Sequence, residues 1–137
     1  MHEHIVIFTD GGARGNPGPA ASGVVISTPD GEVLEAFGRY LGETTNNQAE
    51  YKAILFALQE AKKYSPKRIQ FFMDSELTMK QLNGIYKMKN QDLKVIFDEI
   101  KEFASDYDTT YQHVYRKDNK AADAQVNIAI DKALGLK

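Results

Sequence analysis

Apolar and polar positions alternate along the chain in blocks whose spacing predicts strands and helices in turn. Residues 5–8 form a continuous apolar run and residues 69–73 an apolar-rich one, a pattern typical of strands buried on both faces of a sheet. Two more strands are expected over 23–27 and 32–40, because the turn at 28–31 contains a Pro that presets φ and a Gly that accepts a positive φ. This pair is predicted to form an antiparallel hairpin.

A helix is predicted between this hairpin and the second apolar-rich run. Residues 45–48 (Thr-Asn-Asn-Gln) have the spacing of a capping box, in which the Thr45 side chain caps the helix and the Gln48 side chain bonds back to Thr45. The helix is expected to end near residue 64, because Pro66 cannot continue it. The resulting strand, helix and strand imply a right-handed parallel crossover.

The remaining elements complete an α/β pattern. They are a short helix near 76–82, an amphipathic helix through 93–100, a strand near 109–115 and a last helix from about 119. The chain of 137 residues contains no repeat and no linker, so residues 1–137 are predicted to form a single domain.

Composition narrows the classes of protein that remain. With 42% hydrophobic and 26% charged residues the chain has the balance of a globular protein. Without cysteine it can form no disulfide, thiolate metal site or cysteine nucleophile, so any metal must bind oxygen or histidine. No apolar run approaches the ~20 residues that span a bilayer, and the first residues do not resemble a signal peptide. We therefore expect a cytoplasmic protein with no membrane partner.

Acidic residues follow the two buried strands. Asp10 and Asp74 each come directly after an apolar run, and the carboxyl ends of parallel strands meet at one edge of a sheet. Glu50 shares a helix face with Ile54 and Ala57, so it points toward the same sheet. Carboxylates that cluster repel one another unless a cation lies between them, and oxygen ligands select hard ions such as Mg²⁺ or Mn²⁺.

Each of these acids also has a structural alternative. A strand-terminal Asp is commonly a turn former or a helix cap, which applies to Asp10 and Asp74 taken singly. For Glu50 the alternative is an ion pair, with Lys52, Arg39 or Arg68 as the partner.

Four segments together resemble the motifs of the type 1 ribonuclease H family. In chain order they are residues 9–19 (Thr-Asp-Gly-Gly-Ala-Arg-Gly-Asn-Pro-Gly-Pro), 45–50 (Thr-Asn-Asn-Gln-Ala-Glu), Asp74-Ser75 with 81–84 downstream, and 119–123 (Asn-Lys-Ala-Ala-Asp). The resemblance implies a mixed five-stranded sheet, with three antiparallel strands followed by two parallel ones and helices on both faces. It also implies hydrolysis of the RNA strand of RNA/DNA hybrids with two Mg²⁺ or Mn²⁺ ions, giving 5′-phosphate and 3′-hydroxyl ends.

The same resemblance assigns roles to individual residues. The catalytic metal ligands would be Asp10, Glu50, Asp74 and Asp123, although spacing alone makes Asp123 only an acid favoured by the helix dipole. Substrate contacts would come from the backbone amides of Gly11, Gly12, Ala13 and Arg14 and from Asn16, Thr45, Asn46, Asn47, Gln48, Glu76 and Arg116. Thr45 has the alternative of a helix cap, and Asn16 that of a turn residue.

Departures from the family pattern concern how the substrate is held. Residues 84–92 replace the basic helix and loop that many bacterial relatives insert, so lower affinity for the hybrid is expected, with Lys87 and Lys89 either binding phosphate or merely solvated. Arg116 is a candidate for the role of a missing loop histidine, and His113 is expected to be structural. The resemblance implies a monomer that needs no protein partner. The rival classes are a binding module, which would be expected to lack one of the acids, and a small-molecule phosphatase.

Overall fold

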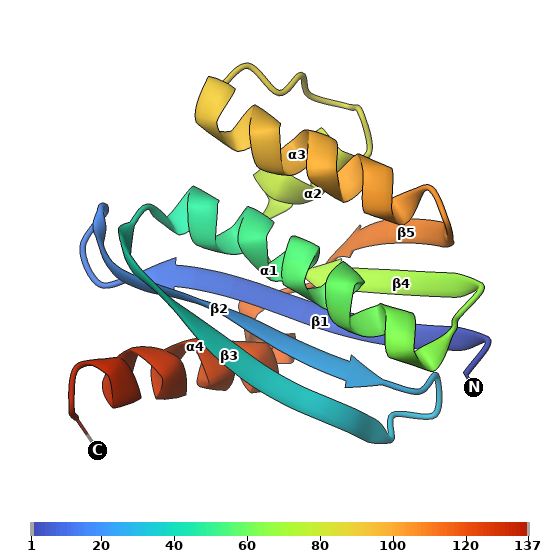
Figure 1. Ribbon diagram of the computed structural model, residues 1–137, viewed down its shortest axis with the longest axis horizontal. Coiled ribbons are helices and arrows are strands. Elements are labelled where there is room, and N and C mark those ends of the chain that lie inside the picture. The colour runs from blue at the N-terminus through green and yellow to red at the C-terminus, as the bar shows by residue number, and fades with distance from the viewer. Residues whose placement is uncertain (1, 137) are drawn as a thin grey trace.

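The computed structural model describes residues 2–136 as one mixed β-sheet with helices on both faces (Figure 1). The strand order is β3-β2-β1-β4-β5, in which β1, β2 and β3 are antiparallel and β4 and β5 run parallel to β1. The strands are β1 (His4–Ala13), β2 (Gly18–Ser27), β3 (Val33–Thr44), β4 (Arg68–Met73) and β5 (Asp108–His113). The predicted fold class is therefore confirmed.

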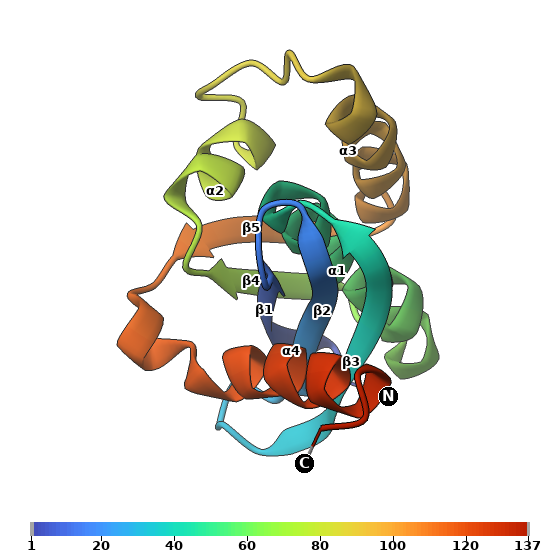
Figure 2. The same cartoon turned by 90° about the vertical axis from the view of Figure 1, so that its left-hand side faces the viewer.

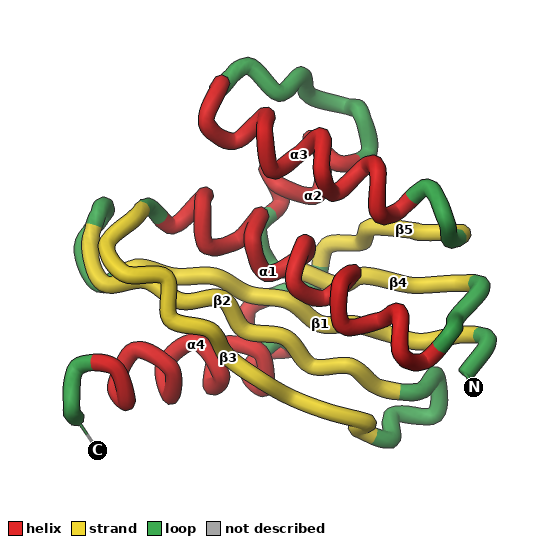
Figure 3. Tube along the Cα trace, in the orientation of Figure 1, coloured by secondary structure: helices red, strands yellow, loops and turns green. Residues whose placement is uncertain are grey.

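The helices divide into two groups about the sheet, as the tube in Figure 3 also shows. They are α1 (Asn46–Ala61), α2 (Glu76–Leu82), α3 (Gln91–Ala104) and α4 (Lys120–Ala133), with short 3₁₀ turns η1 (Lys62–Tyr64) and η2 (Arg116–Asp118). Figure 2 faces the carboxyl ends of β1 and β4, with α2 and α4 on opposite sides of these strands. No helix in the described part of the chain is long and apolar enough to cross a membrane.

The two faces of the sheet are packed very differently. On the α1 face, Ile5, Ile7 and Phe71 are fully buried and join a large core with α1 and α3. Each such side chain contributes about 1.5–3 kcal/mol when it leaves water. On the α4 face the buried cluster is small and consists of Ala21, Val126 and Ile130. Apolar burial therefore fixes α1 firmly, whereas the position of α4 depends more on close backbone contacts and hydrogen bonds.

Local signals begin the helices as expected. The Oγ1 of Thr45 accepts a hydrogen bond from the backbone N–H of Gln48 at 3.1 Å, which confirms the predicted cap of α1. The side chain of Ser75 caps α2 in the same way, by accepting from the N–H of Thr78 at 3.2 Å. Asp74 itself is thus not the residue that caps this helix.

The first strand is longer than the sequence predicted. The predicted apolar run ends at residue 8, yet residues 11–13 still belong to β1 because they pair antiparallel with residues 20–22 of β2. The parallel pairing with β4 stops earlier, at Thr9 opposite Met73. Asp10 therefore lies inside β1, one residue beyond the end of the pairing with β4. From this residue on, the edge of β1 that faced β4 has no paired strand within residues 2–136.

Candidate active site

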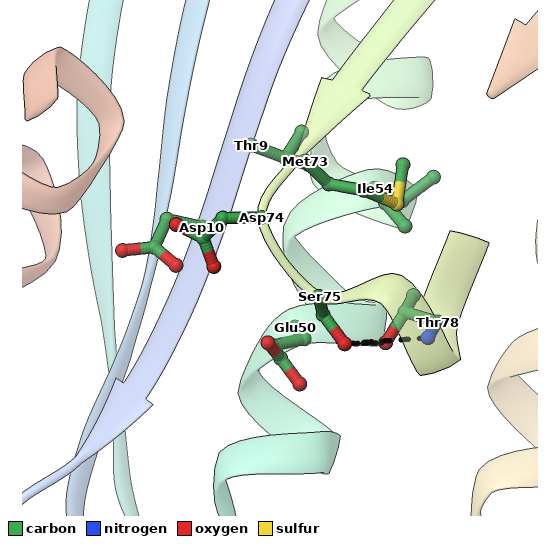
Figure 4. A pocket seen from close by; sticks show the side chains of 8 residues that line it. All are labelled: Thr9, Asp10, Glu50, Ile54, Met73, Asp74, Ser75 and Thr78. Atoms are coloured by element: carbon green, nitrogen blue, oxygen red, sulfur yellow. Dashed lines mark hydrogen bonds between the residues drawn. The ribbon is translucent and has the colours of Figure 1, made fainter. Parts of the chain in front are cut away.

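Three carboxylates converge beyond the last pair of the parallel strands. Asp10 comes from β1, Asp74 directly follows β4, and Glu50 lies in the second turn of α1 (Figure 4). One oxygen of each carboxylate lies within 4.8 Å of the others. The three acids therefore lie together at one edge of the sheet, as the sequence predicted.

The approach of α1 to β1 depends on a missing side chain at Gly11. A Cβ on this residue would lie 2.3 Å from the carbonyl carbon of Ala49 and 2.3 Å from the backbone nitrogen of Glu50. The hydroxyl of Ser22 in β2 also donates to the carbonyl of Ala49 at 2.7 Å, in a buried position. The backbone at Glu50 therefore packs directly against β1 and is hydrogen-bonded to β2 through the neighbouring Ala49.

The charges of the cluster oppose one another. Burial, followed by the charge of Asp74 and a hydrogen bond with Asp123, raises the pKa of Asp10 to about 8. Burial and the charge of Asp74 raise the pKa of Glu50 to about 7, although a hydrogen bond from Ser75 and the charge of Arg116 act in the other direction. Without a cation, Asp10 and Glu50 are therefore partly protonated at neutral pH.

The donor set fits a hard divalent cation. All the converging atoms are carboxylate oxygens, which suit Mg²⁺ and Mn²⁺ rather than softer metals. A cation among them would also offset the burial and the mutual repulsion that raise the two pKa values. The residues present therefore match a metal site in both ligand type and charge.

Asp123 stands next to this cluster and extends it. It lies in the first turn of α4, is exposed, and adds to burial in raising the pKa of Asp10. It falls outside the group of three whose oxygens all lie within 4.8 Å of one another. The fourth acid therefore reaches the site from the opposite face of the sheet, beside Asp10.

The four acids face an open cleft of about 410 Å³. The other residues that line this cleft are Gly11, Gly12, Ala13, Asn46, Asn47 and Arg116. Six of the predicted substrate residues are therefore found here together with all four acids. The side-chain amides of Asn46 and Asn47 and the guanidinium of Arg116 give the cleft hydrogen-bond donors beside its negative charge.

The other predicted substrate residues are held differently. Arg14 forms an ion pair with Asp131 of α4 at 2.7 Å, and Glu76 forms one with Lys80 at 3.6 Å. Thr45 caps α1, and Gln48 supplies the N–H that its hydroxyl binds. None of these four lines the cleft.

Two asparagines connect the end of β1 and the turn that follows it (residues 14–17) to the start of α1. The Oδ1 of Asn16 accepts from the backbone N–H of Asn46 at 3.0 Å, and the Oδ1 of Asn46 accepts from the N–H of Ala13 at 2.7 Å. The N–H of Arg14 donates to the carbonyl of Pro19 at 2.8 Å. The backbone amides of Ala13 and Arg14 are thus already used within the protein and are not free to bind substrate, contrary to the expectation from sequence.

The structural alternatives for the acids find no support among residues 2–136. No salt bridge of Glu50 is present there, and Arg39, one of its three possible partners, lies 3.8 Å from Glu60 instead. The ring of His113 packs edge-on against Tyr115 at 5.7 Å, and His113 does not line the cleft, so its structural role stays a prediction.

Sequence reasoning missed two residues that shape the site. Asn119 is buried and hydrogen-bonded to Asp74, and Gly23 lies opposite Asp10 beneath α4. Asn119 stands inside the fourth motif, which was the available signal, but an Asn before a helix is ordinarily taken for a cap. Nothing in the local pattern marked Gly23, because its role depends on a helix almost a hundred residues later in the chain.

Comparison with known proteins agrees with this geometry. A family model described as "Reverse transcriptase-like" matches residues 8–129. The chain is 39% identical over 127 residues to ribonuclease HI of Halobacterium salinarum, covering 92% of this chain and 64% of that protein. It is 34% identical over 148 residues to a ribonuclease H of Paracidovorax citrulli, covering 96% and 97% of the two chains. It spans only 36% of a bifunctional protein of Mycobacterium tuberculosis to which it is 38% identical.

Solved structures give the same result. The RNase H1 of Halobacterium salinarum superposes with a TM-score of 0.89 at 38% identity, covering 94% of this chain and 98% of that one. LC11-RNase H1 in complex with an RNA/DNA hybrid superposes with a TM-score of 0.91 at 44% identity, covering 95% and 99%. These matches cover nearly the whole of this chain, and the carboxylates lie together where the motifs predicted them. The chain therefore belongs to the type 1 ribonuclease H family.

Proposed function

We propose that this chain is an endoribonuclease that hydrolyses the RNA strand of RNA/DNA hybrids and leaves 5′-phosphate and 3′-hydroxyl ends. The observation that carries the proposal is the convergence of Asp10, Glu50 and Asp74, with Asp123 beside them, on one open cleft. The similarity to LC11-RNase H1, whose structure contains such a hybrid, supports the choice of substrate.

The four acids would hold two divalent cations, either Mg²⁺ or Mn²⁺. Asp10, Glu50 and Asp74 would bind one ion, and Asp10 with Asp123 would bind the other, since Asp10 lies between the two groups. When bound, such ions activate the attacking water and stabilise the leaving 3′ oxygen of a phosphodiester. The protein contributes the negative charge that holds them and the rigid strands that fix their ligands.

Recognition of RNA is assigned to groups in the same cleft. RNA differs from DNA by its 2′-hydroxyl, which both donates and accepts hydrogen bonds. Glu50 and the side-chain amides of Asn46 and Asn47 would meet this hydroxyl and the neighbouring base edges in the minor groove. Arg116, which also lines the cleft, would bind a phosphate of the substrate.

One set of assays tests the proposal. Purified protein is incubated with an RNA/DNA hybrid, double-stranded RNA, double-stranded DNA or a phosphomonoester, each with Mg²⁺, with Mn²⁺ or with excess EDTA. We expect cleavage of the RNA in the hybrid alone, only with a cation, and with 5′-phosphate products. Cleavage that persists in EDTA would contradict the proposal, because the reaction would then need no divalent cation. Products with 2′,3′-cyclic phosphate ends would also contradict it, because the RNA's own 2′ oxygen would then have attacked.

The same assays separate the rival classes. Hydrolysis of the phosphomonoester without cleavage of the hybrid would indicate a phosphatase. Tight binding of the hybrid without any cleavage would indicate a binding module.

A further inference from the structure

The side chain of Asn119 does not do what its position suggests. Asn119 occupies the N-cap position of α4, yet its side chain makes no capping hydrogen bond. Only 1% of the residue is exposed, which is rare for an amide side chain. Capping of α4 therefore does not explain why this side chain is buried.

The amide nitrogen of Asn119 instead binds two acid-bearing segments. The Nδ2 donates to the backbone carbonyl of Thr9 at 2.9 Å and to Oδ2 of Asp74 at 3.1 Å. Both partners are acceptors, so the amide orientation follows from chemistry. Thr9 directly precedes Asp10, and Thr9 pairs with the residue before Asp74 at the end of the parallel ladder. One amide thus spans the point where β1 and β4 separate.

The backbone of Asn119 connects the fourth acid to the same point. Its carbonyl accepts the N–H of Asp123 at 3.1 Å, in the first turn of α4. Any movement of Asn119 therefore moves Asp123 as well. The residue links Asp10, Asp74 and Asp123 through three hydrogen bonds, each made to a different segment.

The chemistry of an amide suits this place better than a cation would. A Lys or Arg beside Asp74 would neutralise charge that the site needs for divalent ions, whereas an amide donates hydrogen bonds without a net charge. The Oδ1 of Asn119 has no hydrogen-bond partner among the described residues although it is buried. A buried acceptor without a partner is unfavourable, so the donated bonds must outweigh it.

We propose that Asn119 is a positioning residue that holds the carboxylates of Asp74 and Asp123 in register with Asp10 and thereby sets the affinity of the site for divalent cations. The inference rests on the cation site of the proposed function. Partners that orient metal ligands typically change metal affinity by about 10- to 100-fold when they are removed. Asn119 would belong to this class while touching neither the cation nor the substrate.

The test compares Asn119→Leu with Ser27→Ala in the full chain. Leu has the same branching and the same number of side-chain heavy atoms as Asn but donates no hydrogen bond. Ser27 is also buried and also donates to a carbonyl of β1, that of Val6 at 3.1 Å, but it lies at the far end of the strand from the acids. Mn²⁺ binding to each protein without substrate is measured by calorimetry, and the free energy of unfolding is measured in EDTA.

We expect Asn119→Leu to bind Mn²⁺ at least tenfold more weakly than the wild type, and Ser27→Ala to bind it within twofold. The kcat of Asn119→Leu should recover in part at high Mn²⁺, which a merely structural defect would not allow. Asn119→Ser, which keeps one shorter donor, should fall between Asn119→Leu and the wild type.

Each other outcome has a distinct meaning. If the wild type binds no Mn²⁺, the proposed cation site fails and the inference with it. If the wild type binds Mn²⁺ and folded Asn119→Leu binds it within twofold, the inference alone is overturned. If neither Asn119→Leu nor Asn119→Ser folds, the inference is also overturned, because Asn119 would then be a requirement of the fold and not of the site.

Discussion

Gly23 lies directly opposite Asp10 in the antiparallel register of β1 and β2. A Cβ on Gly23 would lie only 2.2 Å from the carbonyl oxygen of Ala122, the residue before Asp123. The missing side chain therefore lets α4 rest on the sheet beside Asp10. This contact explains how an acid from the last helix reaches acids that come from β1 and β4.

Gly23→Ala is expected to weaken catalysis more than its effect on stability would suggest. The added methyl group must push the first turn of α4 away, which costs about 1–3 kcal/mol in overpacking. Withdrawing Asp123 by about 1 Å should lower kcat roughly 100-fold. Steady-state cleavage of a hybrid and denaturant unfolding measure the two effects.

Gly31→Ala is the matched control for this experiment. Gly31 has a φ of +93° in the β2–β3 turn, so Ala there is strained by about 1–2 kcal/mol without any contact with α4. It should lose stability but keep its kcat. An equal kcat for Gly23→Ala and the wild type would show that Asp123 is not placed by this contact.

Asp10→Asn is expected to abolish cleavage and yet to stabilise the metal-free protein. Because the pKa of Asp10 is raised from 3.8 to about 8, the folded protein binds more protons than the unfolded chain between these pH values. The free energy of unfolding of the wild type in EDTA should therefore fall as the pH rises through this window. The variant has no carboxylate at position 10 and does not lose this stability. Its free energy of unfolding should therefore equal that of the wild type near pH 4 and exceed it at pH 8.

Denaturant unfolding in EDTA at both pH values measures this difference. Asp30→Asn, in the exposed β2–β3 turn, serves as the control and should change stability equally at the two pH values. A variant at Asp10 that is less stable than the wild type at pH 8 would mean that this carboxylate is a structural partner and not a member of a repelling cluster.

Arg116→Ala is expected to raise the pKa of Glu50. The positive charge of Arg116 favours the ionised form of Glu50, and its loss should keep the carboxyl protonated to a higher pH. A carbon-13 NMR titration of the Glu50 carboxyl in EDTA measures the shift. Lys117→Ala, in the same exposed turn, is the control, since Lys117 does not line the cleft. If the Glu50 carboxyl titrates identically in the Arg116 variant and in the wild type, Arg116 does not act on this carboxyl.

The double change of Lys87 and Lys89 to Ala tests how the hybrid is held beyond the cleft. Both lysines are in the segment between α2 and α3, whose Ile85 and Tyr86 are exposed. If each lysine neutralises one phosphate, KM should rise and the log-log salt slope should flatten by about 0.9 per lysine, while kcat stays nearly constant. The pair Lys67→Ala and Arg68→Ala, at the amino end of β4, removes the same charge far from the acids and should change neither quantity. An unchanged KM after loss of Lys87 and Lys89 would show that they are only solvated.

Local patterns in the sequence were enough to predict the helices, the strands and three of the four clustered acids. Apolar runs, the capping box at Thr45 and the helix face shared by Glu50 and Ile54 are local patterns. The elements form near where these patterns predict them, although β1 and β2 extend further than expected. The rule that parallel strands end at one edge then brought Asp10 and Asp74 together without further information. These inferences needed only periodicity and connectivity.

The position of α4 at the site, and the choice of which backbone donors stay free, depend on how the layers pack. The place of Asp123 follows from a backbone contact at Gly23, and the alignment of Asp74 from a buried amide at Asn119, neither of which leaves a periodic signal. Likewise, Ala13 was expected to offer its amide to the substrate, but the fold gives that N–H to Asn46. Such contacts join residues far apart in the chain through close approach and hydrogen-bond geometry, and these exist only once the layers have packed.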